Sequence, residues 1–194
     1  MKYLSEVREK FGSLPAFTIS DLQVFLGTKK ISKNYLYLLI HNLVKSGEIK
    51  KISRGVYTFL DESETVGFGF TPFYYGLQEA LSLKNLWEQE TNPIVLTPRK
   101  VRSGVRQFEG SNFVVRRIAR KMFFGFTTMR YKDFWIPVSD NEKTLIDFAY
   151  FNEPLSNEAL AGLRKNLDRK KLLEYLKRCP EITRRKVKKL AKLG

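Results

Sequence analysis

Acidic side chains that could hold a catalytic metal ion are few and poorly placed in this sequence. The candidates are Asp133, Asp140, Glu142 and Asp147. Nucleases and nucleotidyltransferases need two or three carboxylates that converge on Mg²⁺. Asp140 stands where the N-cap of a helix is expected, and Asp147 lies two helical turns further along. We therefore expect these residues to form no active site.

His41 is the only histidine and Cys179 the only cysteine. One of each cannot assemble a Cys/His metal cluster, an internal disulfide or a metallohydrolase site with several histidines. His-based triads are also disfavoured, because His41 would need a nucleophile beside it. The glycines at 67 and 69 lack the spacing and the Lys-Ser/Thr ending of a phosphate-binding loop. The sequence predicts no enzyme activity, no cofactor and no metal, and a metal-dependent nuclease is the alternative.

Basic side chains are the most abundant chemically active groups. The 194 residues include 35 Lys and Arg against 20 Asp and Glu, a net charge of +15. The excess lies in three blocks, 1–60, 99–132 and 155–194, separated by acidic stretches. Segregated positive charge favours a polyanionic partner, because several phosphates can then be met together. We rank nucleic acid above an anionic membrane, since the C-terminal basic helix lacks a broad aromatic face.

The first basic block must form elements that present its cations together. The spacing of apolar residues predicts a helix over 2–11, a second from Thr18 or Ser20 to about residue 26, and a third that begins at a Ser32 cap. The third helix carries one apolar stripe of Leu36, Leu39, Ile40 and Leu43. Residues 48–59 read as two short strands around a basic turn, with apolar side chains that we expect to close over the helices: Ile49, Ile52, Val56 and, as a further candidate, Phe59.

Three helices followed by a basic hairpin are the layout of a winged helix-turn-helix, which we assign to residues 1–60. In this arrangement the third helix enters the major groove of DNA and the hairpin lies along the phosphate backbone. The predicted double-stranded DNA contacts on the helix and hairpin are Ser32, Lys33, Asn34, Tyr37, His41, Lys45, Lys50, Lys51, Ser53 and Arg54. Leu38 either contacts a thymine methyl group or packs against another domain or chain. Lys50 and Lys51 alternatively protect a strand edge, and a winged helix can also serve protein contacts alone.

Residues 61–194 are predicted to form a second domain that mixes helices and strands, so the fold class is α+β. A short acidic linker over 61–65 precedes a strand at 66–70 and a helix from Thr71 or Pro72 to about residue 83. Further strands are expected at 94–97, 113–118, 123–129 and 134–138, which gives a small sheet of four or five strands. A helix capped by Asp140 follows, with Lys143 and Asp147 as a pair one turn apart, and the basic tail 155–194 adds three helices.

The second basic block alternates cations with aromatic residues. Its aromatics either stack on single-stranded nucleic acid or fill the core, and strand alternation favours the core. The basic run over 164–192 is either solvated surface or an arm that contacts the DNA backbone. The predicted secondary basic patch for DNA or RNA consists of Arg99, Lys100, Arg102, Arg106, Arg116, Arg117 and Arg120.

Two segments of the sequence carry a family resemblance. Residues 43–57, LVKSGEIKKISRGVY, resemble the helix end, basic wing and Gly-Val-Tyr closure of the AbiEi-type antitoxins and transcriptional regulators of abortive-infection systems. Residues 138–147, VSDNEKTLID, resemble the Glu-Lys-Thr-Leu-x-Asp helix start of the same family's second domain. Together with the small-residue helix at 75–81 and the strand at 94–97, the matches cover most of residues 16–150.

The resemblance implies a cytoplasmic repressor of its own operon within a type IV toxin-antitoxin system. Its second domain would counteract a nucleotidyltransferase-type toxin encoded beside it, without forming a stable complex. A stand-alone regulator with no toxin partner is the alternative within the family. We expect the operator to be an inverted repeat. We also expect no membrane association, because no apolar run approaches the 18 or so residues that cross a bilayer and the N-terminus lacks the apolar core of a signal peptide.

Overall fold

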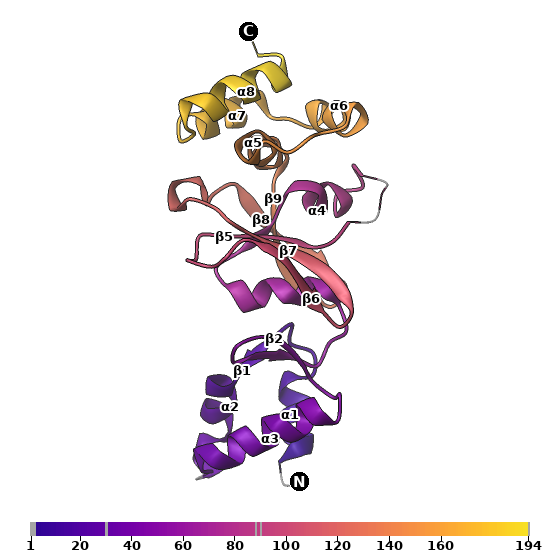
Figure 1. Ribbon diagram of the computed structural model, residues 1–194, viewed down its shortest axis with the longest axis vertical. Helices are drawn as coiled ribbons and strands as arrows, with labels where there is room; N and C mark the ends of the chain where they lie inside the picture. Colours follow the sequence, from indigo (N-terminus) through magenta and orange to yellow (C-terminus); the bar gives the residue numbers. More distant parts are fainter. Residues whose placement is uncertain (1–2, 30, 88, 90, 194) are drawn as a thin grey trace.

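The chain is elongated, with three parts stacked along its long axis (Figure 1). The computed structural model describes residues 3–29, 31–87, 89 and 91–193. A small helical module with its own sheet lies at the N-terminal end, a six-stranded sheet lies in the middle, and helices cover the far side of that sheet. The α+β class and the N-terminal winged helix-turn-helix predicted from the sequence are confirmed.

The N-terminal module has the element order of a winged helix-turn-helix. Its sheet runs β1-β3-β2, with both pairings antiparallel. Strand β1 is only two residues long and was not predicted from the sequence. The elements are α1 (Leu4–Phe11), β1 (Phe17–Thr18), α2 (Ile19–Leu26), the 3₁₀ turn η1 (Gly27–Lys29), α3 (Lys33–Lys45), β2 (Lys50–Ser53) and β3 (Val56–Thr58).

Local hydrogen bonds fix where α2 and α3 begin. The Thr18 hydroxyl accepts a hydrogen bond from the Asp21 backbone N–H at 3.1 Å, while the Asp21 carboxylate accepts one from the Thr18 N–H at 2.7 Å. This reciprocal capping box satisfies two N–H groups that a helix start leaves unpaired. At α3, the Ser32 hydroxyl accepts a hydrogen bond from the Tyr35 N–H at 3.3 Å. Both caps agree with the sequence prediction.

The hairpin between β2 and β3 packs against its own helices on one face and against the second half of the chain on the other. Ile49 is buried in the N-terminal core, as expected. Ile52 and Val56, however, pack in the cluster under the six-stranded sheet, so the expectation that they close over the helices is wrong. The hairpin joins the two cores because its two faces carry apolar residues that point in opposite directions.

The central sheet mixes parallel and antiparallel pairs in the order β6-β7-β5-β4-β9-β8. The pairs β5–β7 and β4–β9 are parallel, and the others are antiparallel. Six strands form where four or five were expected, because β4 and β6 were missed. The strands are β4 (Tyr74–Tyr75), β5 (Ile94–Thr97), β6 (Gly104–Phe108), β7 (Ser111–Arg117), β8 (Phe126–Tyr131) and β9 (Phe134–Ser139), with the 3₁₀ turn η3 (Arg120–Met122) after β7.

The segment before the sheet differs from the prediction. The strand expected at 66–70 is part of a 3₁₀ helix, η2 (Ser63–Phe70), and α4 (Leu77–Ser82) begins five residues later than Pro72 because β4 comes first. Close packing at two glycines explains η2. A Cβ atom on Gly67 would lie 2.0 Å from the Phe73 ring, and one on Gly69 would lie 2.7 Å from Ile52. Only glycine allows the backbone to approach its neighbours this closely.

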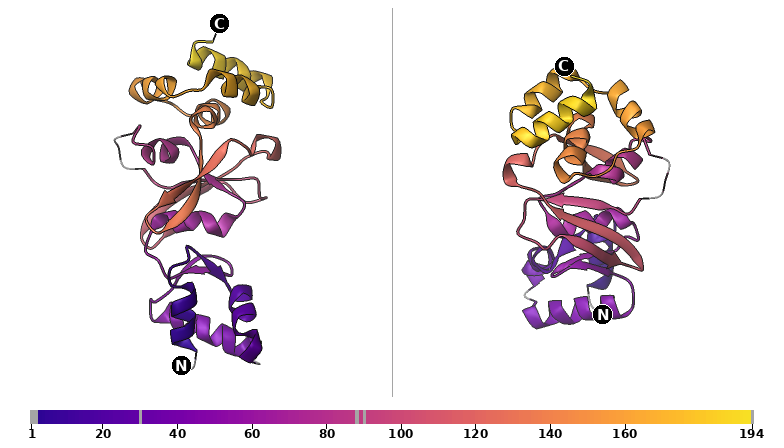
Figure 2. Two further views of the ribbon diagram at one scale, coloured as in Figure 1. Left: turned by 180° about the vertical axis from the view of Figure 1, so that it is seen from behind. Right: turned by 45° about the horizontal axis from the view of Figure 1, so that its top comes forward.

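The helices after the sheet stack outward from it (Figure 2). α5 lies directly on the sheet, and α7 and α8 pack on α5. One apolar cluster fills this side of the sheet and a second fills the side that faces η2 and the hairpin. The four helices are α5 (Asn141–Phe151), α6 (Asn157–Lys165), α7 (Arg169–Leu176) and α8 (Glu181–Ala191).

Candidate nucleic-acid interface

Helix α3 lies at the N-terminal end of the molecule and exposes one polar face (Figure 1). Its opposite face is buried, through Leu36, Leu39, Ile40 and Leu43. Tyr37 is 58% exposed and Leu38 is 54% exposed. The other residues predicted on this face are also exposed: Lys33, Asn34, His41 and Lys45.

The charge on α3 is positive and unneutralised. The helix contains no Asp or Glu. Within the described residues, Lys33 and Lys45 take part in no ion pair. Ser32 is exposed, but its hydroxyl is committed to the helix cap. Two free cations, an amide and two ring side chains therefore share one exposed helix face.

Helix α2 adds one exposed position that sequence reasoning missed. Val24 counted toward the apolar pattern of this helix, yet its side chain is 82% exposed. In a helix-turn-helix the first helix crosses the DNA backbone. An apolar residue in a helical pattern reads as core, so the sequence held no signal for this exposure.

The hairpin provides two free cations instead of the four polar side chains predicted. Lys50 forms an ion pair with Asp61 and its side chain is only 13% exposed. The Ser53 hydroxyl donates to the Gly69 carbonyl at 3.3 Å. Both side chains are thus used to join the hairpin to the second half, because η2 packs against β2. Lys51 and Arg54 remain exposed.

The secondary basic patch begins where the hairpin ends. The Gly69 carbonyl that accepts from Ser53 also accepts from the Arg99 guanidinium at 3.1 Å. Arg106 is partly held in place, by a hydrogen bond to the Arg102 carbonyl at 3.0 Å and by the Phe70 ring. Arg116 forms an ion pair with Glu153. The remaining members of the patch are exposed and free of ion pairs among the described residues: Lys100, Arg102, Arg117 and Arg120.

The aromatic residues of this block belong mainly to the core. Phe108, Phe113 and Phe124 are buried. Phe123, Phe126 and Tyr131 are half-buried and pack against the same clusters. This agrees with the interpretation that strand alternation places these rings inside the fold.

The carboxylates of the α5 start are occupied by contacts inside the chain. Asp140 accepts hydrogen bonds from the Lys143 N–H and the Tyr175 hydroxyl, both at 2.8 Å. Glu142 accepts from the Asp168 N–H at 2.7 Å. Among the residues that the structure describes, no three His, Cys, Asp or Glu side chains are grouped so that they could hold a metal ion.

Lys143 and Asp147 form an ion pair that is fully buried. The Tyr74 hydroxyl donates a second hydrogen bond to the Asp147 carboxylate at 3.0 Å. Burial raises the pKa of Asp147, while the Lys143 ammonium and the Tyr74 hydroxyl oppose that shift. The pair predicted from the sequence exists, but it lies between the sheet and the outer helices rather than on the surface.

Glu79 on α4 is a buried carboxyl group that accepts a hydrogen bond from the Thr91 hydroxyl at 2.8 Å. Burial raises its pKa to about 7, although the Thr91 hydrogen bond opposes the shift. Because the folded-state pKa is higher than the ordinary value of 4.5, the unfolded chain releases this proton first. The contribution of Glu79 to stability therefore decreases as the pH rises from about 4.5 to about 7.

We predict that Glu79→Gln stabilises the protein at high pH and not at low pH. One pKa unit corresponds to about 1.4 kcal/mol, so the gain in the free energy of unfolding should be about 2–3 kcal/mol larger at pH 8 than at pH 5. Urea unfolding at the two pH values measures this difference. Glu158→Gln, at an exposed position on α6, is the matched control. An equal effect of Glu79→Gln at both pH values would contradict the argument.

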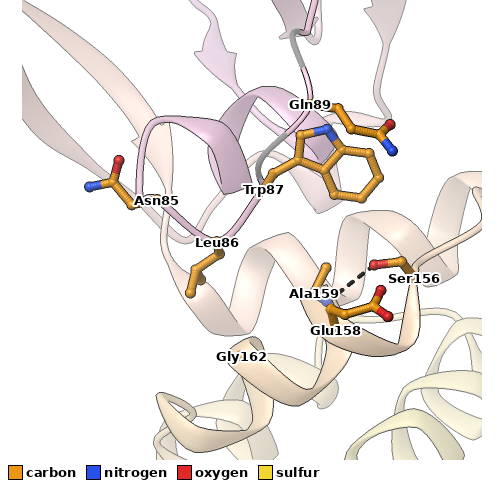
Figure 3. Close-up of a pocket in the computed structure, with 8 residues that line it drawn as sticks. All are labelled: Asn85, Leu86, Trp87, Gln89, Ser156, Glu158, Ala159 and Gly162. Carbon is orange, nitrogen blue, oxygen red and sulfur yellow. Dashed lines mark hydrogen bonds between the residues drawn. The ribbon is translucent and has the colours of Figure 1, made fainter.

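A hollow of about 400 Å³ lies between the segment after α4 and helix α6 (Figure 3). Trp87 and Gln89 stand on one side of it, and Ser156 and Glu158 stand at the start of α6 on the other. The hollow is in the second half of the chain, so it forms no part of the α3 surface. None of the helices in the described part of the chain has the length and apolar character needed to cross a membrane.

The fold and the exposed helix define the class: an α+β chain that carries a winged helix-turn-helix at one end. One solved structure with a similar fold is that of the RV2827C protein from Mycobacterium tuberculosis, with a TM-score of 0.60 and 13% sequence identity. The match covers 91% of this chain and 71% of that one. At this identity the similarity concerns the fold. No protein-family model matches the chain, and no curated protein matches it either.

Proposed function

We propose that the chain is a DNA-binding transcriptional regulator whose helix α3 enters the major groove of an operator duplex. The observation that carries this proposal is the exposed polar face of α3, which points away from the remainder of the molecule. A helix of this kind fits the major groove, which is about 12 Å wide. In helix-turn-helix proteins, the second helix of the motif occupies that groove.

The side chains on α3 have complementary roles in this proposal. Asn34 pairs with the edge of an adenine, and Leu38 contacts a thymine methyl group. Lys33 and Lys45 meet phosphate oxygens or guanine. Tyr37 and His41 donate to phosphates. The exposed cations outside α3 extend the positive surface along the backbone: Lys51, Arg54, Lys100, Arg102, Arg117 and Arg120.

Footprinting on the DNA upstream of the gene that encodes the chain tests the proposal. The expected result is protection of an inverted repeat. Binding should weaken steeply with salt, because each neutralised phosphate releases a counterion. With six to ten phosphate contacts, affinity should fall by about 10³–10⁵ between 50 and 200 mM salt. Cleavage of the nucleic acid that depends on Mg²⁺ would instead support the nuclease alternative.

We predict that substitutions on α3 and on the hairpin have different consequences. Asn34→Ala should reduce discrimination at one base pair by about 1–3 kcal/mol, because an adenine contact is lost. Lys51→Ala and Arg54→Ala should weaken binding to all sequences alike and lower the salt slope by about one unit each. Competition binding with operator variants and random duplexes measures both effects. Unchanged operator preference in Asn34→Ala would mean that α3 is placed incorrectly in the groove.

The finer proposal is an AbiEi-like antitoxin that represses its own operon and counteracts a nucleotidyltransferase-type toxin. It is supported by the resemblance at 43–57 and 138–147. In the second segment, Lys143, Thr144 and Asp147 are fully buried, so these residues maintain the fold of the second half and supply no surface for a partner. The product of the adjacent gene should arrest growth when it is expressed alone, and co-expression of this chain should relieve the arrest. If growth arrest persists, or if the adjacent gene encodes a protein of another class, the antitoxin proposal fails and the stand-alone regulator remains.

A further inference from the structure

Helix α8 carries the densest positive charge of the second half on its outer face. Its inner face is buried through Thr183, Val187 and Ala191, which pack toward α5. The residues between them are exposed: Ile182, Arg185, Lys186, Lys188 and Lys189.

Half of these four cations lack a partner among the residues that the structure describes. Lys186 donates to the Asn152 side chain at 2.8 Å, and Arg185 reaches Glu181 only at 4.0 Å. Lys188 and Lys189 form no ion pair with any residue that the structure describes. Like charges three and four residues apart on a helix repel one another. The helix dipole favours Lys188 and Lys189, which lie in the last turn of α8. It does not account for the neighbouring cations Arg185 and Lys186, and a cluster of this kind suits an external polyanion.

The position of α8 determines which polyanion it can meet. α3 and α8 lie at opposite ends of the long axis (Figures 1 and 2), and each buries one face against the body of the molecule. The hairpin sheet, η2, the central sheet and α5 separate them. With layers spaced by about 10 Å, the two faces are roughly 40–50 Å apart. DNA has a persistence length of about 500 Å, so a duplex seated on α3 would have to turn back on itself to reach α8.

We propose that the outer face of α8 binds the backbone of a second DNA duplex, so that one chain bridges two DNA segments. This proposal rests on the proposed function, because it assumes that α3 holds the first segment. The α8 face offers only lysines and an arginine as charged groups for DNA, and we assign them to phosphate oxygens, which carry no sequence information, so this binding is independent of sequence. Bridging would give the protein a second activity, the joining of its operator to distant or neighbouring DNA.

A capture experiment tests the bridge. Operator duplex is fixed to beads, the protein is added, and retention of a second, fluorescent duplex of random sequence is measured. Wild type should retain the second duplex. For Arg185→Glu/Lys188→Glu/Lys189→Glu, the affinity for the bead-bound operator should stay within about threefold of wild type. The amount of second duplex that it captures should fall at least about tenfold. The neutral variant Arg185→Gln/Lys188→Gln/Lys189→Gln removes the charges without introducing carboxylates, so it controls for misfolding. Its capture of the second duplex should be intermediate between that of wild type and that of the glutamate variant.

A matched control separates the α8 cluster from net charge. Lys121→Glu/Arg130→Glu/Lys165→Glu changes the charge by the same amount at exposed positions spread over the second half. It should capture the second duplex like wild type. Equal loss in this control, unchanged capture in both α8 variants, or selective capture of an RNA duplex would overturn the proposal. So would a parallel loss of operator binding, because α8 would then lie on the same duplex as α3.

Failure of the proposed function would look different. If wild type does not prefer operator over random DNA, α3 reads no sequence and the regulator proposal fails. If capture of the second duplex still depends on Arg185, Lys188 and Lys189 in that case, the proposal that the outer face of α8 binds DNA would still be supported. The two readouts, operator preference and α8-dependent capture, therefore fail independently.

Discussion

Lys143→Met is expected to lower the free energy of unfolding by about 3–5 kcal/mol at pH 8. The substitution keeps a side chain of similar length in the space between the Tyr74 and Phe124 rings. It removes the ammonium group that pairs with Asp147, and both partners are fully buried. An uncompensated carboxylate would then remain inside the protein, where charge is costly. Urea unfolding monitored by circular dichroism measures the loss.

Two companion measurements identify the cause of that loss. At pH 5 the destabilisation should be smaller, because an isolated buried carboxyl group takes up a proton more readily. Lys143→Met/Asp147→Asn should regain most of the stability, since the amide oxygen can still accept the Tyr74 hydrogen bond. A loss below about 1 kcal/mol in Lys143→Met, or no recovery in the double variant, would show that the pair does not stabilise the fold as argued.

Tyr37→Glu/His41→Glu is expected to reduce operator affinity at least about 100-fold. The two positions are one turn apart on the exposed face of α3. Carboxylates there would face phosphates and base acceptors, which reverses the electrostatic attraction that dominates DNA binding. The thermal midpoint should change little, because neither side chain is buried. Fluorescence anisotropy with labelled operator measures the affinity.

The matched control places the same two charges on another exposed helix face. Asn157→Glu/Ala161→Glu on α6 has the same spacing and the same change in net charge. Its operator affinity should stay within about threefold of wild type, because α6 lies in the second half, away from α3. If both variants lose affinity equally, long-range charge rather than the α3 surface governs binding.

The N-terminal module was largely predictable because its signals are local. The stripe from Leu36 to Leu43 has helical spacing, and Ser32 supplies the expected cap. Thr18 and Asp21 likewise define the start of α2 over four residues. Such patterns depend on neighbours along the chain, so they can be read without knowing the tertiary fold.

Elements that depend on distant partners were harder to predict. β4 has only two residues and exists because β5 and β9 lie on either side of it. β6 carries exposed and charged positions and is held by β7. Residues 66–70 alternate like a strand, yet they form part of a 3₁₀ helix whose glycine backbone lies close against Phe73 and Ile52. In each case, contacts remote in sequence overrode the local pattern.

The residues of the candidate site also fall into two groups, those predictable from local patterns and those that depend on contacts remote in sequence. The exposed face of α3 follows from its own apolar stripe, and the structure leaves that face open. Lys50 and Ser53 were assigned to DNA because they lie in a basic hairpin, but Asp61 and Gly69 occupy them. No pattern within the hairpin reveals that η2 packs beside it. The exposure of Arg185, Lys188 and Lys189 follows from helix periodicity. Their position at the end of the molecule opposite α3 is known only from the three-dimensional structure.

The most direct test of the central claim is cross-linking from α3 to DNA bases. Cys179 is buried, so Asn34→Cys introduces one accessible thiol at the position of the exposed helix face that we assign to a base edge. Operator DNA that carries a disulfide-forming group in the major groove should cross-link to this variant at one or two base positions in each half of the repeat. Asn157→Cys, on α6, should not react. Cross-linking from residue 157, or none from residue 34 while operator binding persists, would contradict the placement of α3 in the groove.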